Sequence, residues 1–148
     1  MGQTRTYKCS KCGNTVEINE GIGFMWHTFE KSMFYPPKKD SYGLNFYDEL
    51  DKDMLEEIHE FIESSDESFV ADAYYQPYIC KKCGKVESML YFRIEGVKSY
   101  KAQTYRPKYK CVCGSRFRKL TTKELKHLCC SKCGTDMEEV SELHMFWD

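Results

Sequence analysis

Eight of the nine cysteines in this 148-residue chain fall into four closely spaced pairs, a pattern that constrains the fold more than any other feature. Three pairs read Cys-x-x-Cys-Gly, namely Cys9/Cys12, Cys80/Cys83 and Cys130/Cys133, and the tighter fourth pair, Cys111/Cys113, also precedes a glycine. Two thiols at this spacing share one tight turn and can point at a single tetrahedral ion. A glycine directly after the second cysteine tolerates the positive φ that closes such a turn.

Each cysteine pair supplies half the ligands of a four-thiolate site, so four pairs predict two metal sites. The four pairs can be combined in more than one way. Pairing in chain order joins Cys9, Cys12, Cys80 and Cys83, and then Cys111, Cys113, Cys130 and Cys133. We favour this order because 16 residues separate Cys113 from Cys130, a natural length for a hairpin. The alternative joins Cys80/Cys83 to Cys111/Cys113 and brings the two ends of the chain together. Cys129 is expected to be a free thiol, since the motif begins at Cys130.

The ligand set indicates the metal and argues against catalysis. Closed four-thiolate sites most commonly hold zinc, so we expect two Zn²⁺ per chain, with iron chemically possible in the same ligands. Four protein ligands leave no position for an activated water, and no nucleophile stands at recognisable spacing from a base, so we expect no enzymatic activity.

The sequence also predicts the compartment. A disulfide framework would need an oxidising compartment, and the first residues lack the apolar stretch of a secretory signal. No apolar run reaches the roughly 18 residues that cross a membrane. We therefore expect a cytoplasmic protein without a membrane partner.

Each cysteine pair with the glycine after it forms one short turn, which we call a knuckle. The sequences of these knuckles resemble those of a known group. Cys9-Ser-Lys-Cys-Gly13, Cys80-Lys-Lys-Cys-Gly84 and Cys130-Ser-Lys-Cys-Gly134 are similar to the knuckles of zinc-ribbon and rubredoxin-like proteins, which carry two of them on β-hairpins. Cys111-Val-Cys-Gly114 departs from that motif by one residue. The whole chain resembles small uncharacterised bacterial double-zinc-ribbon proteins. A rubredoxin-like iron site would imply an electron carrier.

One amphipathic helix stands out between the first two knuckles. Apolar residues recur from Phe46 to Ile62 at close to a 3.6-residue period, and Asn45 is a plausible N-cap. We expect this helix to be an insertion, at about residues 24–67, between the two halves of one metal site.

The rest of the chain reads mainly as short strands. Strands are expected at 16–18, 70–79, 86–94, 97–105 and 116–120, with a last strand within 137–147. Glu95-Gly96 is a two-residue turn signal, and Thr121 with Glu124 fits a capping box. The predicted fold is a small α+β, β-rich protein with two Cys₄ zinc ribbons and one inserted amphipathic helix. The first ribbon would span residues 1–106 and the second residues 107–148.

The net charge of −1 hides a strong polarity along the chain. Residues 51–79 carry nine acidic side chains and one basic one, whereas residues 80–135 carry fifteen basic and three acidic ones. Basic residues interleaved with aromatic ones are typical of single-strand nucleic-acid binders. The candidate nucleic-acid contacts are Arg93, Lys98, Lys101, Arg106, Arg116, Phe117, Arg118 and Lys119. Strand alternation explains the same pattern by placing the rings in the core and the charges in water.

The sequence therefore predicts a non-enzymatic zinc-binding protein whose two structural sites support a binding or adaptor module with an unknown protein partner. The alternatives are a nucleic-acid-binding zinc ribbon that uses the basic segment 80–120 and a rubredoxin-like iron electron carrier.

Overall fold

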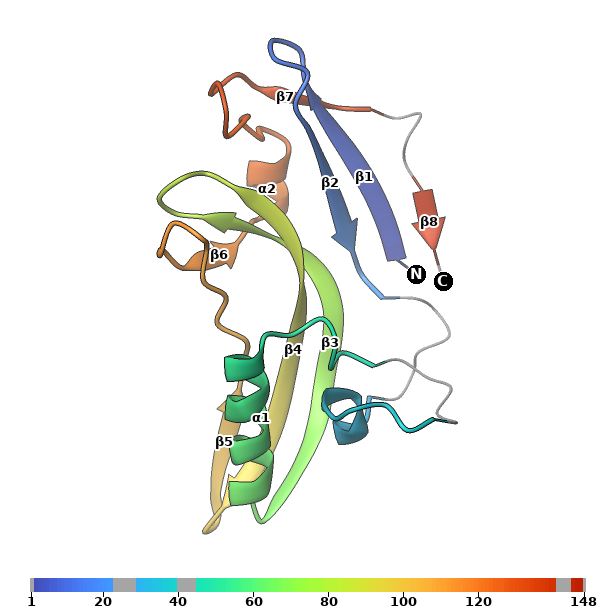
Figure 1. The fold of residues 1–148 in the computed structure, drawn as a ribbon, viewed down its shortest axis with the longest axis vertical. Helices are drawn as coiled ribbons and strands as arrows, with labels where there is room; N and C mark the ends of the chain where they lie inside the picture. The colour runs from blue at the N-terminus through green and yellow to red at the C-terminus, as the bar shows by residue number, and fades with distance from the viewer. Residues whose placement is uncertain (1, 23–28, 40–44, 141–144, 148) are drawn as a thin grey trace. The chain divides into compact units, whose positions relative to one another are not determined.

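The computed structural model of the chain describes residues 2–22, 29–39, 45–140 and 145–147, and these residues are rich in β-structure (Figure 1). The strands are β1 (Gly2–Cys9), β2 (Thr15–Glu20), β3 (Glu67–Cys80), β4 (Val86–Lys98), β5 (Lys101–Tyr105), β6 (Phe117–Lys119), β7 (Met137–Glu139) and β8 (Met145–Trp147). The helices are the 3₁₀ turn η1 (Lys31–Phe34), α1 (Lys52–Ser64) and the single turn α2 (Thr122–Leu125). This content of strands and helices confirms the predicted small α+β, β-rich fold class.

The chain divides into two compact units. The first unit comprises residues 1–25, 74–90 and 108–148, and the second comprises residues 26–73 and 91–107. β3 and β4 contribute residues to both units. The predicted division at residue 106 rested on pairing the cysteines in chain order, whereas the compact units interleave along the sequence.

The first unit contains a sheet built around β1, which pairs antiparallel with β2, β7 and β8. β7 pairs with the end of β1 at Cys9 and β8 with its beginning at Gly2, so both strands follow the same edge of β1. The predicted single strand within 137–147 is thus two strands, and residues 141–144 lie outside the described part. β1 itself was not predicted.

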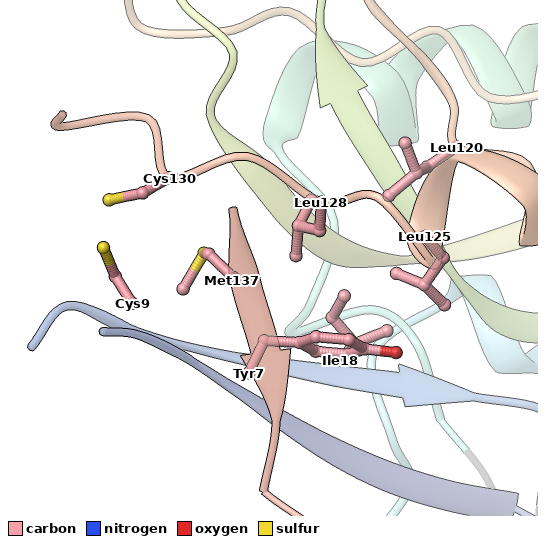
Figure 2. Packing of buried hydrophobic residues seen from close by; sticks show 8 residues of the cluster. All are labelled: Tyr7, Cys9, Ile18, Leu120, Leu125, Leu128, Cys130 and Met137. Atoms are coloured by element: carbon pink, nitrogen blue, oxygen red, sulfur yellow. The ribbon is translucent and has the colours of Figure 1, made fainter. Parts of the chain in front are cut away.

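A small hydrophobic core fills the first unit (Figure 2). It contains the buried residues Tyr7, Cys9, Ile18, Leu120, Leu125, Leu128, Cys130 and Met137. Figure 2 shows the sulfur atoms of Cys9 and Cys130 at one end of this cluster and Leu120 and Leu125 at the other. The capping box predicted at Thr121 is present: its side chain accepts from the Glu124 amide, and the Glu124 carboxylate accepts from the Thr121 amide.

The second unit has an aromatic core. The ring of Phe34 lies 4.8 Å from that of Phe92 and 5.9 Å from that of Phe46, centroid to centroid, and all three side chains are fully buried. Ile58 of α1 and Ile94 of β4 are also fully buried. The apolar side of α1 is thus buried in the same unit as aromatic side chains that come from η1, a loop and β4.

Helix α1 begins later than its apolar pattern predicted. Asp51, not Asn45, is the N-cap, and its carboxylate accepts from the Met54 amide at 2.8 Å. The Asn45 side chain instead accepts from the Tyr47 amide and donates to the Tyr35 carbonyl. Phe46 and Leu50 are buried without being helical, so the apolar period over 46–50 reflects burial in the core of the second unit.

The turn predicted at Glu95-Gly96 is also wrong. β4 continues through Gly96 to Lys98, and the chain reverses at Ser99 and Tyr100, whose φ values are 50° and 63°. A Cβ on Gly96 would lie 2.7 Å from Ser65 Oγ and 3.1 Å from the Phe61 ring. This glycine therefore permits close approach of the end of α1 to β4 and forms no turn.

Candidate metal centres

All four cysteine knuckles share one backbone frame. In each, the amide of the first cysteine donates to the carbonyl of the residue after the glycine, at 2.8–2.9 Å. The glycine amide donates back to the carbonyl of the first cysteine, at 2.8–3.1 Å. The glycines that follow the second cysteine have φ between 70° and 82°, which confirms the predicted positive φ. The shorter Cys111/Cys113 knuckle keeps both hydrogen bonds, so its missing residue does not change how the turn closes.

The first centre joins the two ends of the chain. Cys9 ends β1 and Cys12 lies in the turn after it, while the bridge between Cys129 and Asp136 closes the hairpin of Cys130 and Cys133. β7 continues from that hairpin and pairs with β1, with Met137 opposite Cys9. This pairing places the last knuckle beside the first one.

The second centre is built in the same way around β3. Cys80 ends β3, and Cys83 lies in the turn that leads into β4. The bridge between Lys110 and Arg116 closes the hairpin of Cys111 and Cys113, and β6 then pairs with β3, with Phe117 opposite Cys80. In each centre a short strand after the second knuckle pairs with the strand before the first knuckle.

The sulfur positions fit tetrahedral coordination. In the first centre, Cys9 and Cys133 Sγ lie 3.4 Å apart, Cys12 and Cys130 Sγ 3.6 Å, and Cys12 and Cys133 Sγ 3.7 Å. In the second centre, Cys80 and Cys113 Sγ lie 3.4 Å apart, and Cys83 and Cys111 Sγ 3.6 Å. Four sulfurs about 2.3 Å from one zinc ion would be separated by about 3.8 Å. Among the described residues, these two groups of four cysteines could each hold a metal ion.

Pairing in chain order is therefore wrong, and the alternative pairing is the one found. The groups are Cys9, Cys12, Cys130 and Cys133, and Cys80, Cys83, Cys111 and Cys113. The helical segment between Cys12 and Cys80 consequently connects two different centres and does not interrupt one. The short spacing between Cys113 and Cys130 favoured pairing in chain order. The cysteine pairs are instead brought together by strands more than a hundred residues apart, as β1 and β7 are.

The protonation chemistry of the sulfurs also suits a divalent cation. The amides of Cys83 and Lys82 donate to Cys80 and help to lower the pKa of its thiol to about 6. The Cys113 amide acts in the same direction on Cys111, but burial and the neighbouring sulfurs outweigh it and raise that pKa to about 12. Four thiolates this close repel one another, so a bound cation is what allows all four to be deprotonated together.

Cys129 belongs to neither group. Its exposed thiol lies 3.4 Å from Asp136 Oδ1, and the hydrogen bond to that carboxylate raises the pKa of the thiol. The structure thus places this cysteine as the sequence predicted, next to a ligand but outside the ligand set.

The eight candidate nucleic-acid contacts divide between the two units. Four of them, from Arg93 to Arg106, belong to the second unit and four, from Arg116 to Lys119, to the first. Arg93 forms ion pairs with Asp72 and Glu95, and Arg118 binds both oxygens of Glu124. Phe117 is half-buried, whereas Lys98, Lys101, Arg106, Arg116 and Lys119 are exposed.

Comparison with protein-family models, with curated proteins and with solved structures finds no significant match to this chain. Within the described residues, no helix combines the length and the apolarity needed to cross a bilayer.

Proposed function

We propose that this chain is a non-enzymatic zinc-binding protein in which two structural, zinc-ribbon-like centres hold a β-rich module that binds a protein partner. The observation that carries the proposal is the convergence of four cysteine sulfurs in each of two groups, all within 4.8 Å of one another. Four thiolates saturate a zinc ion, which favours a structural role over a catalytic one.

The positions of the two centres support a role in folding. Each joins hairpins far apart in sequence, as Cys12 and Cys130 illustrate, and each has two of its cysteines buried. Structural zinc contributes an apparent binding free energy of about 10–16 kcal/mol in small zinc-finger peptides at pH 7. That is as large as the whole stability of about 5–15 kcal/mol typical of a domain. Metal binding and folding of the first unit should therefore be coupled.

Metal analysis combined with NMR tests this proposal. We expect two ions per chain, no visible colour, and loss of amide dispersion in the first unit when a chelator removes the metal. A red protein with iron–thiolate absorption would favour the electron-carrier alternative instead. A chain that keeps its dispersion and its melting temperature after complete metal removal would contradict a structural role.

Nucleic-acid binding is a second candidate, favoured by the tip of the β4–β5 hairpin. The Tyr100 ring is fully exposed there, between the exposed side chains of Lys98 and Lys101. An exposed ring flanked by cations can stack on a base while the lysines contact phosphates. An electrophoretic shift with single-stranded RNA or DNA, weakened by salt and by Tyr100→Ala, would support it, and no shift at micromolar protein would remove it.

A further inference from the structure

The first unit contains a groove between two knuckles, one from each candidate metal centre. Its walls are the Cys80–Gly84 and Cys130–Gly134 turns, and its volume is about 710 Å³. Ile79, Leu120 and Leu128 line it, and Leu120 and Leu128 also pack into the core of the first unit. We call it the knuckle groove. Its size lies within the range of about 300–1,000 Å³ typical of ligand sites.

Among the described residues, two lysines and one glutamate are the formally charged ones that line the knuckle groove. Lys123 and Lys132 line it and are exposed, and within the described part of the chain neither forms an ion pair. Glu124 is the one carboxylate among the described lining residues, and Arg118 binds both its oxygens at 2.6 and 3.0 Å. The Arg118 guanidinium, with the Thr121 amide and hydroxyl, lowers the pKa of Glu124 to about 2. This carboxylate is thus ionised, and the Arg118 guanidinium already offsets its charge.

The negative charge of the metal centres is offset by lysines other than the two that line the groove. Four thiolates and one Zn²⁺ give each centre a formal charge of −2. Lys8 and Lys11 accompany the knuckle of the first centre, and Lys81 and Lys82 that of the second, so each centre has two lysines to offset it. Lys123 and Lys132 are then the cations that line the groove, and Asp136, which accepts from the lining Cys129, is a carboxylate beside it.

We propose that the knuckle groove binds a segment of a partner protein in which one or two bulky apolar side chains stand next to Asp or Glu. The apolar floor would bury the large side chains, and Lys123 and Lys132 would pair with the carboxylates at the rim. Central apolar anchors inside a polar rim are the usual source of binding energy at protein interfaces. The inference rests on the proposed function, because both walls are metal-binding turns, and it names the chemistry of the partner.

The test is selection of a random 12-residue peptide library displayed on phage against the zinc-loaded full chain. We expect enriched peptides to carry Asp or Glu within two positions of Phe, Leu, Met or Trp. Synthetic versions should shift the amide resonances of Ile79, Leu128 and Ser131. Binding should weaken at least about tenfold in the Lys123→Glu/Lys132→Glu variant, since both rim cations become repulsive.

A matched control is Lys108→Glu/Lys119→Glu, which makes the same charge change at exposed residues of the first unit outside the groove. It should bind as the unchanged protein does. Ser131→Trp, which would fill the groove from its exposed wall, should also abolish binding and serves if the double lysine variant does not fold. Enriched peptides that bind all variants equally, or no enrichment at all, would overturn the proposal. Metal content measured on each sample shows separately whether the structural role of zinc has failed.

Discussion

At the residue scale, Gly96 is the position where packing leaves no room for a side chain. The end of α1 approaches β4 so closely there that Ser65 Oγ would lie 2.7 Å from an added Cβ. We predict that Gly96→Ala lowers the free energy of unfolding by about 1–3 kcal/mol, the usual cost of overpacking a core. Urea unfolding measures this change.

Two further variants sharpen that prediction. Lys101→Ala, at an exposed position of β5, should change stability by no more than about 0.5 kcal/mol. Ser65→Ala in the Gly96→Ala background should recover part of the loss, because it removes the nearest atom. Equal stability of Gly96→Ala and the unchanged protein would show that the contact is not as close as described.

Tyr105 gives a prediction about pH. Burial, and then the charge of Glu57, raise the pKa of its phenol, whose hydroxyl donates to Glu57 Oε2 at 3.1 Å. In the unfolded chain a tyrosine ionises near pH 10. The native protein therefore holds this proton longer, so the stability due to Tyr105 is complete below about pH 10 and is lost as pH rises further.

Comparison with Tyr105→Phe isolates this effect from that of the other tyrosines. The stability of the unchanged protein relative to the variant should fall steadily between pH 9 and pH 11 in urea unfolding. A difference that stays constant over this range would mean that Tyr105 ionises equally in both states.

At the element scale, the β4–β5 hairpin turns through two non-glycine residues with positive φ. The left-handed conformation costs an L-residue roughly 1–2 kcal/mol, and turns of this kind favour glycine. We predict that Tyr100→Gly raises the free energy of unfolding by about 1 kcal/mol, while Tyr100→Ala does not raise it. A destabilising Tyr100→Gly would contradict the described turn.

The start of α1 gives a second prediction at this scale. Asp51→Ala should destabilise the protein by about 1 kcal/mol, because the Met54 amide loses its capping acceptor. Asp53→Ala, in the first turn but without a capping role in the structure, should cost only a few tenths. Equal effects at the two positions would place the N-cap elsewhere.

Local chemistry explains which elements the sequence could predict. The knuckle glycines and the Thr121 capping box follow from interactions within five residues, and both are present. The apolar period predicts too early a start for α1, because Phe46 and Leu50 continue that period but are buried in a loop. The role of Gly96 does not follow from local sequence, because this glycine packs against residues of the α1 end some 30 positions away. Hydrophobic periodicity reports burial, and burial is not specific to one backbone conformation.

At the scale of the whole molecule, strand pairing decides which knuckles share a candidate metal centre. The sequence identified all eight cysteines of the two groups, because each knuckle is a local turn. It could not pair the knuckles, since the partners depend on β7 reaching β1 and on β6 reaching β3. In the resulting arrangement the chain ends meet at one centre, and the middle of the chain forms the other.

Metal stoichiometry of two double variants, measured by native mass spectrometry, tests this pairing most directly. Cys12→Ser/Cys133→Ser removes two ligands of one centre and should leave one ion bound at the other. Cys12→Ser/Cys83→Ser removes one ligand from each centre and should lower the occupancy of both. Cys129→Ser, the control, should retain two ions. The opposite pattern, with one ion fully retained in Cys12→Ser/Cys83→Ser and both weakened in Cys12→Ser/Cys133→Ser, would contradict the account.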